Sequence, residues 1–394
     1  DSWGDGWNGN GLIVSINGNI TDTLTISTGS TSSFSIPVNV GDVIDFDYVN
    51  DVYSTGVNTY PGENSYTIFN PDNNLVGSGT YDNSTGDVND VLAVTACPSW
   101  AVIPDDNFEA YLEANGMGDG IPNNDTVSIA NIANVKKLDV SNQNIADLSG
   151  ISYFTELIIL VCENNSLTSL DITQNSNLEK LNCRYNQISN LDLSQNTALT
   201  TLNLSDNNFS TINVSQNTAL EQLSCEDNLL STLDVSNNTS LKYFICGDNQ
   251  LTNLNVSANT ALTYLGCHAN QLTSLDVSNN IALEVLSFGK NQLSTLDVSN
   301  NTAINEIRCY ENQLIYLDLS ANTNLTKIDI SYNPLTCLNL KNGFNTNIVD
   351  FNAKQNTNLN CIEVDNPNWS TSNWINVDSN LNFSTNCSYP AGCF

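Results

Sequence analysis

The chain has 394 residues, with 10 Lys and Arg against 42 Asp and Glu, and a formal charge of −32. A surface this acidic repels nucleic-acid phosphates and anionic lipid head groups, which excludes nucleic acid as a partner. The hydrophobic content of 40% is enough for folded cores, yet no run approaches the roughly 20 apolar residues of a membrane-spanning helix. We expect a folded protein that does not span a membrane. Because it begins at Asp1 without Met, we expect a processed chain or a fragment.

Residues 1–98 carry short apolar segments such as GLIVSING and VIDFDYV, separated by Gly, Asn, Asp and Pro. This pattern of short apolar segments between turn-forming residues predicts an antiparallel β-sandwich, followed by a linker over residues 99–103. The opening turn holds the oxygen ligands Asp1, Asp5 and Asn8 between glycines, as a structural calcium ion requires. The alternative is a turn whose Asp and Asn side chains cap backbone amides.

Residues 104–394 form the second predicted domain, which opens with a cap over about 104–134. The segment DDNFEAYLEANG places Phe108 and Leu112 at helical spacing. We expect an amphipathic helix that covers the first coil of the repeats that follow.

A period of 21 residues dominates the repeats, over about 135–340. Eight segments, from LEKLNCRYNQI at Leu178 to TKIDISYNPL, fit the leucine-rich repeat pattern L-x-x-L-x-L-x-x-N-x-L. A second half-repeat, such as SLDVS, lies between them. Since one coil cannot bury its own apolar face, the coils must stack around a shared core.

Three columns of this stack are predicted to be internal or structural. The Asn column, which includes Asn186 and Asn249, is expected to hydrogen-bond to turn backbone. A column of Cys, alternating with Leu, Phe and Ile, predicts buried reduced thiols, with a metal or redox stack as the alternative. An outward Asp column, which includes Asp171 and Asp234, predicts a solvated ladder, with bound divalent ions as the weaker interpretation.

The outward face of the first half-repeat varies from coil to coil while its core does not. Tyr and Arg are favoured at binding hot spots, and Tyr rings suit sugar rings. The alternative is an ordinary solvated sheet. The predicted ligand-binding residues are Tyr185, Tyr243, Tyr264, His268, Arg308, Tyr310 and Tyr332.

Residues 341–394 break the period and are expected to form an irregular C-terminal cap. The five cysteines off the repeat column are the disulfide candidates. Cys361 with either Cys337 or Cys387 would staple the last coil, and the connectivity stays open. These cysteines are Cys97, Cys337, Cys361, Cys387 and Cys393.

The repeats resemble the secreted and surface leucine-rich repeat proteins of Bacteroidota, from IPDDNFEAYL to CIEVDNPNWSTSNWINVD. The opening DSWGDGWNGNGLIVSING looks like a β-sandwich module of type IX-secreted proteins in the same bacteria. The resemblance implies an extracellular or outer-membrane location, with secretion or anchoring machinery engaged by a segment outside this chain. It also implies that Glu63 completes the calcium site, and that Thr23 and Thr126 are O-glycosylated within Asp-Thr-aliphatic motifs.

Enzymatic activity is not expected. A site of the Ser-His-Asp or Cys-His type needs a base beside its nucleophile, and His268 is the single histidine. The sequence therefore indicates neither such a site nor a zinc-binding cluster of histidines. Paired carboxylates are compatible with the composition, but a leucine-rich solenoid offers a smooth face without a deep cleft.

We expect a secreted or cell-surface binding or adhesion protein that recognises a glycan or a surface protein through the variable face. Two alternatives stay open. One is that the chain is the accessory module of a larger secreted degradative enzyme, and the other is that it is a structural component of a surface layer.

Overall fold

The computed structural model describes residues 11–16, 19–24, 43–49, 65–69, 75–80, 94–95, 100–390 and 393. The chain divides into two compact units, which are described separately. One unit comprises Asp1–Ala101 with Ser128–Ala130, and the other comprises Val102–Val127 with Asn131–Phe394.

The first unit contains antiparallel strands. Among its described residues, four strands form one sheet in the order β2-β1-β3-β6, and β4 pairs with β5. These strands are β1 (Gly11–Ile16), β2 (Asn19–Leu24), β3 (Val43–Val49), β4 (Ser65–Phe69), β5 (Leu75–Thr80) and β6 (Val94–Thr95). The packing of the two sheets into a sandwich stays a prediction.

Several predicted residues of this unit lie outside the described residues. They are Asp1, Asp5, Asn8, Glu63 and Cys97. The calcium site therefore stays a prediction.

The second unit opens with the predicted cap helix, α1 (Asp106–Ala114), in which Phe108 and Leu112 are fully buried. One carboxylate oxygen of Asp105 accepts hydrogen bonds from the backbone of Asn107 and Phe108, which caps the helix. The other accepts from Ala146 and Asp147 in the first coils. The 3-10 helix η2 (Ile151–Tyr153) also belongs to this unit. β7 (Trp100–Val102), β8 (Thr126–Ser128) and α2 (Ile129–Ile132) each contain residues of both units.

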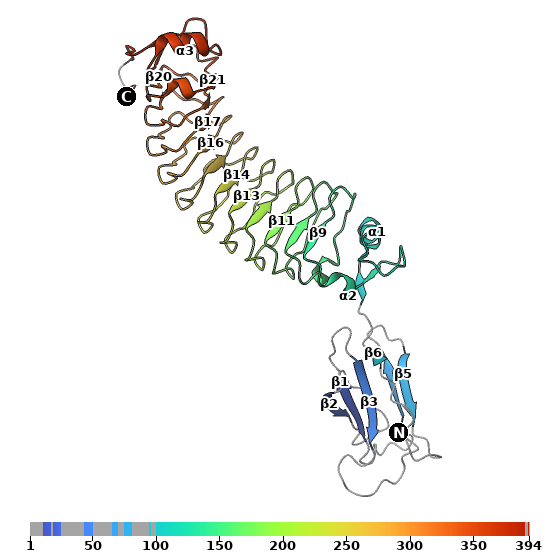
Figure 1. Ribbon diagram of the computed structural model, residues 1–394. Coiled ribbons are helices and arrows are strands. Elements are labelled where there is room, and N and C mark those ends of the chain that lie inside the picture. The colour runs from blue at the N-terminus through green and yellow to red at the C-terminus, as the bar shows by residue number, and fades with distance from the viewer. Residues whose placement is uncertain are drawn as a thin grey trace. The chain divides into compact units, whose positions relative to one another are not determined.

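A parallel sheet then runs along the stack of coils (Figure 1). Within residues 100–390 it has 11 strands, and most neighbours pair residues that are one 21-residue repeat apart, as Leu181 pairs with Leu202. The strands are β9 (Lys137–Asp139), β10 (Ile159–Val161), β11 (Lys180–Asn182), β12 (Thr201–Asn203), β13 (Gln222–Ser224), β14 (Tyr243–Ile245), β15 (Tyr264–Gly266), β16 (Val285–Ser287), β17 (Glu306–Arg308), β19 (Lys327–Asp329) and β21 (Asp350–Asn352).

The core of the stack is the predicted apolar column at the middle of each strand. Every member is at most 2% exposed, and each contributes about 1.5–3 kcal/mol by burial. The column comprises Leu181, Leu202, Leu223, Phe244, Leu265, Leu286, Ile307 and Ile328.

The predicted Asn ladder is confirmed. The side-chain amide of Asn249 donates to the carbonyls of Cys225 at 2.9 Å and Gly247 at 2.8 Å, and its oxygen accepts from the backbone N–H of Leu230 at 2.9 Å. Each Asn therefore joins its own turn to the preceding coil.

A second Asn ladder, not predicted from sequence, lies in the other half of the coils. The amide of Asn259 donates to the carbonyls of Val235 and Asn238, both at 2.9 Å. The repeating Asn-Thr-Ala segments carry this ladder, so both turns of each coil are tied by buried amides.

The repeat-column cysteines are free and buried, as predicted. Burial raises the pKa of Cys183, Cys225 and Cys267 to about 12, so these thiols stay protonated. They act as small apolar core residues.

The C-terminal segment is more regular than expected. β21 extends the main sheet, and a second parallel sheet joins β18 (Tyr316–Asp318), β20 (Cys337–Asn339), β22 (Cys361–Glu363) and β23 (Asn382–Ser384). The main sheet continues because Phe351 takes the buried place that a Leu fills in other coils, although the paired Ile328 lies 351 − 328 = 23 residues earlier. The 3-10 helix η3 (Asn345–Asn347) and helix α3 (Pro367–Asn373) complete the segment.

Two disulfides tie this end. Cys361 pairs with Cys387, which is one of the two predicted alternatives, and Cys337 pairs with Cys393. Both bridges join Cα atoms that lie 5.9 Å apart.

The Asn ladder predicts a large stability difference between two Asn variants. We expect Asn249→Ala to lower the free energy of unfolding by about 3 kcal/mol, because buried backbone groups lose their partners. Asn279, which is exposed and makes one side-chain bond of 3.3 Å, is the control. Asn279→Ala should cost less than about 0.5 kcal/mol in the same urea titration, and equal losses would contradict the ladder's role.

The buried thiols predict a labelling pattern. Without reductant, at least six more thiols should react with a maleimide in denaturant than in the native protein, because the described free cysteines are all buried. Mass spectrometry counts the added groups. Rapid native labelling of Cys183 or Cys225 would contradict their burial.

Candidate functional site

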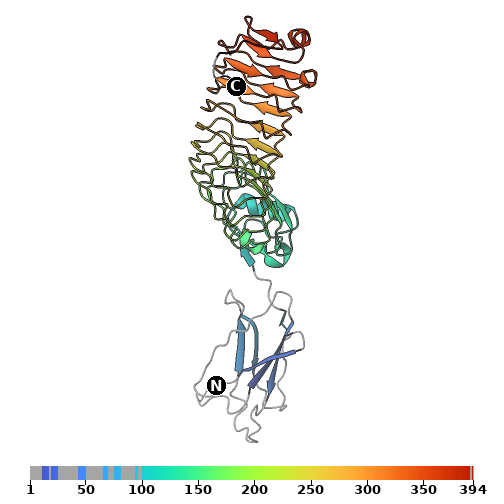
Figure 2. The same ribbon diagram turned by 90° about the vertical axis from the view of Figure 1, so that its left-hand side faces the viewer.

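The outward side chains of β10–β17 and β19, with the turn that follows each of these strands, define what we call the strand face. Figure 2 shows the backbone of these stacked coils. Side chains alternate along a strand, so Tyr243 and Ile245 point away from the core into which Phe244 is buried. The stacked coils hold neighbouring strands in register. A side chain on this face therefore meets the equivalent side chains of the coils before and after it.

The turn after each strand places one residue in the left-handed conformation. Tyr185 has φ 55°, Asp248 has φ 47° and Tyr332 has φ 56°. The Asn of the ladder follows directly and holds this turn. Tyr185 and Tyr332 therefore lie in these turns, at the edge of the strand face. His268 and Tyr310 also lie beyond the ends of β15 and β17, so four of the seven predicted binding residues are not on strands.

An aromatic pair lies near the middle of the strand face. Tyr243 and Tyr264 occupy equivalent positions on β14 and β15, and their rings stack with centroids 4.4 Å apart. Tyr243 is 39% exposed, and partial burial raises the pKa of Tyr264. Each ring covers one face of the other, and the pair leaves part of its ring surface exposed.

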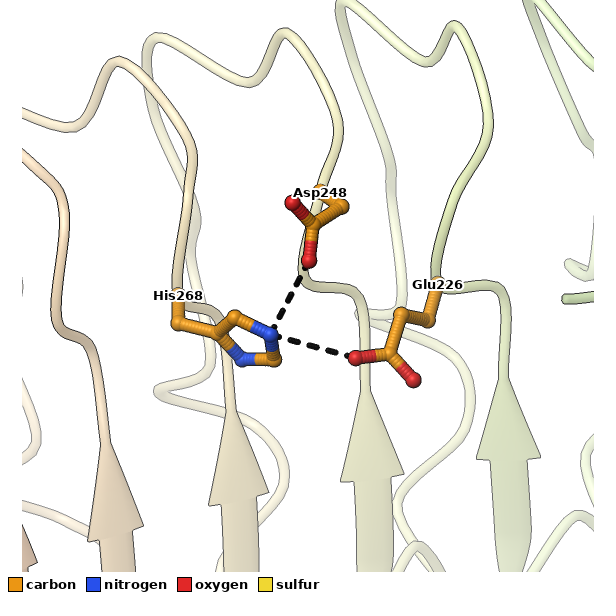
Figure 3. Close-up of side chains that lie close together, drawn as sticks. All are labelled: Glu226, Asp248 and His268. Carbon is orange, nitrogen blue, oxygen red and sulfur yellow. Dashed lines mark ion pairs between the residues drawn. The ribbon is translucent and has the colours of Figure 1, made fainter. Parts of the chain in front are cut away.

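A polar cluster lies beside this pair (Figure 3). The Nε2 atom of His268 lies 3.1 Å from Oε1 of Glu226 and 3.0 Å from Oδ2 of Asp248. The three residues follow β13, β14 and β15, so the cluster spans three adjacent coils. His268 reaches Glu226 across the intervening coil, because a Cβ at Gly247 would lie only 2.5 Å from the imidazole.

Carboxylates outnumber cations around this cluster. Burial is the main cause that raises the pKa of Glu226, and the charges of Asp227 and Asp248 raise it further, whereas His268 lowers it. The pKa of Asp227 is also raised, first by burial and then by Asp248. Arg184, the nearby permanent cation, pairs with Asp206 through a contact of 2.8 Å.

A pocket of about 260 Å³ lies further along the stack, on β17, β19 and β21 and the residues next to them. Arg308 and Lys327 both contact Glu306, at 2.6 and 3.2 Å. The Tyr310 ring lies over Gly289, where a Cβ would come within 2.5 Å of it. The lining residues are Arg308, Tyr310, Lys327, Ile328, Asp329, Asp350, Asn352 and Asn376.

The structure thus brings four of the seven predicted residues together in two pairs. Tyr243 stacks on Tyr264, and Arg308 shares a pocket with Tyr310. The carboxylate partners of His268 were not predicted. A usable signal existed, since Glu226 occupies the same repeat position as His268, two repeats or 268 − 226 = 42 residues earlier, with Gly247 between them.

The outward Asp column of the other half-repeat has a local role. Asp171 accepts a hydrogen bond from the backbone of Thr173 at 3.0 Å, and Asp234 accepts one from Ser236 at 2.9 Å. Hydrogen bonds to Thr173 and to Ser236 lower the pKa of these two carboxyls. The column closes turns, and ion binding there stays a prediction.

The two predicted glycosylation residues lie on strands. Thr126 is partly buried in β8, and its backbone N–H donates to the Asn124 side chain. Thr23 lies in β2, and its side chain is outside the described residues. Glycosylation stays a prediction at both.

No helix of the described part is long and apolar enough to cross a membrane.

Comparison with known proteins identifies the fold of the repeats. No family model matches the chain. A stretch of 73 residues is 38% identical to Internalin J of Listeria monocytogenes serotype 4b, and it spans 18% of this chain and 8% of that protein. The solved functional domain of InlJ from Listeria monocytogenes, which includes a cysteine ladder, has a TM-score of 0.56 and 31% identity over 68% of this chain and 67% of that chain.

A more distant structure has the same fold. The leucine-rich repeat ectodomain of a plant membrane receptor kinase from Arabidopsis thaliana has a TM-score of 0.55 and 23% identity, over 66% of this chain and 36% of that chain. The predicted leucine-rich repeat solenoid is therefore confirmed. Bacteroidota origin, the N-terminal module and type IX secretion stay predictions.

The raised pKa of Glu226 predicts a pH-dependent stability difference in metal-free buffer. Because the folded state holds the Glu226 proton more tightly than the unfolded state, ionisation of Glu226 lowers stability. Glu226→Gln should therefore become more stable than the wild type as the pH rises above 4.5, the ordinary pKa of a Glu side chain. Below that pH the two proteins should differ little in stability. Thermal unfolding across this range measures the difference.

The matched control is Glu284→Gln, which changes an exposed carboxylate. Its difference from the wild type should not show the same rise with pH. A Glu226→Gln variant that instead loses stability toward neutral pH would show that the Glu226 charge stabilises the fold.

Proposed function

We propose that this chain, which belongs to the leucine-rich repeat proteins and whose solenoid is similar to that of the Listeria internalins, is a secreted or surface protein that binds another protein through its strand face. The binding is non-catalytic. The observation that carries the proposal is the stacked pair on the sheet, in which Tyr243 is exposed and Tyr264 is partly buried.

The construction of the strand face supports this function. Its core positions are uniformly apolar and buried, whereas the outward positions change from coil to coil. At the first outward position of consecutive strands stand Lys180, Thr201, Gln222, Tyr243, Tyr264, Val285, Glu306 and Lys327. A fixed scaffold with varied outward residues suits recognition, because partner contact does not require the scaffold to rearrange.

Two parts of the face supply different contacts. The Tyr243 and Tyr264 rings offer apolar area with little side-chain freedom to lose, as binding hot spots do. The pocket at Arg308 and Lys327 offers cationic donors on an otherwise acidic chain. A partner that meets both parts would combine an apolar centre with acidic groups.

A glycan is the second candidate ligand. The exposed ring surface of Tyr243 and Tyr264 favours it, because sugar rings pack against aromatic side chains. The same surface serves both candidates, and a direct binding comparison separates them. An accessory role beside an enzyme, or a surface-layer role, stays an alternative to both.

The test compares two variants for binding to an array of extracellular proteins and glycans. Tyr243→Ala/Tyr264→Ala removes the stacked pair, and we expect at least a tenfold loss of affinity for any saturable ligand. Tyr153→Ala is the control, because Tyr153 is 37% exposed and lies in η2, away from the strand face. It should bind as the wild type does.

Protein ligands on the array would support the main proposal, and glycan ligands the second candidate. Full retention of binding by the double variant would overturn the assignment to the aromatic pair. If Tyr153→Ala lost binding to the same extent, the loss would not be specific to the strand face and would contradict the assignment.

A further inference from the structure

The cluster of Glu226, Asp248 and His268 has the composition of a transition-metal site. It offers one imidazole nitrogen and two carboxylate oxygens from three adjacent coils, and these atoms all lie within 4.8 Å of one another. Imidazole and carboxylate together suit zinc and related ions, whereas calcium and magnesium take oxygen ligands alone.

The distances fit a small ion. Ligand atoms about 2.0–2.1 Å from a tetrahedral zinc ion lie about 3.3 Å from one another. The His268 nitrogen lies 3.1 Å from Glu226 and 3.0 Å from Asp248, so shifts of a few tenths of an ångström bring these pairs to that separation. Three protein ligands leave a fourth position open.

The charge around the cluster favours a cation. Glu226, Asp227 and Asp248 lie close enough to affect one another's ionisation, and Asp206 is already paired with Arg184. His268 supplies at most one positive charge to this group. A dication supplies two and contacts both of the carboxylates that His268 now contacts.

The residues around the cluster also support a metal site formed by His268 and the two carboxylates. Gly247 lies under the imidazole, and any side chain there would push His268 away from Glu226. The cysteines of the same coils are not competing ligands, because Cys225, Cys246 and Cys267 are at most 1% exposed and belong to the core.

We propose that Glu226, Asp248 and His268 bind a divalent transition-metal ion of the zinc class on the strand face, with the fourth position open to water or to a side chain of a bound partner. The ion would join three adjacent coils. This site is independent of the proposed binding function, since metal binding requires no partner.

The experiment is a titration of the chelator-treated full chain with zinc chloride in a calorimeter. We expect the wild type to bind one more zinc ion than His268→Ala. Glu226→Gln and Asp248→Asn should each weaken this site at least tenfold. Cobalt(II) gives a second readout, because its visible absorption bands report nitrogen and oxygen ligation and should be lost in His268→Ala.

Two further variants separate the site from general effects. Asp234→Asn removes an exposed carboxylate of the other half-repeat and should leave zinc binding unchanged. Gly247→Ala keeps all three ligands but displaces the imidazole, so it should weaken zinc binding while circular dichroism shows a folded protein. Calcium chloride should produce no matching signal at the site.

The proposal is overturned if the wild type and His268→Ala bind the same number of zinc ions with the same affinity. It is also overturned if calcium occupies the site as strongly as zinc, since that would identify an acidic patch and not an imidazole-containing site.

Discussion

The buried side-chain amide of the repeating Asn is the interaction on which this fold depends. Asn249 donates to carbonyls of its own turn and of the preceding coil, and accepts from a third segment. These bonds satisfy backbone groups that no strand or helix pairs. They also hold the preceding residue in the left-handed conformation, as at Asp248. The position of every side chain at the edge of the strand face follows from this turn.

The repeating part of the fold was predictable from sequence because its constraints recur every 21 residues. The Leu column, the Asn ladder and the inward cysteines each follow from one position seen many times. The C-terminal coils were not predictable in this way. The step from Ile328 to Phe351 is longer than one repeat, yet Phe351 still pairs in register, because burial of an apolar side chain tolerates extra residues in the turn.

The candidate site was predictable in composition but not in its contacts. Repeat position identified Tyr243, Tyr264 and His268 as outward residues. Which neighbours they meet depends on the direction in which each side chain leans, and this direction is decided by what lies beside it. The absence of a side chain at Gly247 directs His268 toward Glu226, while the aligned tyrosines stack in adjacent strands. Contacts between side chains of different coils can therefore be predicted only when the residues beside them in the sheet are placed as well.

The two disulfides at the end of the stack bear on how the protein comes apart. In a linear stack, a terminal coil has one neighbour instead of two and is the natural starting point for unravelling. The bridges Cys337–Cys393 and Cys361–Cys387 fasten the final coils to one another, so that end cannot peel away one coil at a time. The coils nearest the C-terminus are therefore not the natural starting point for unravelling.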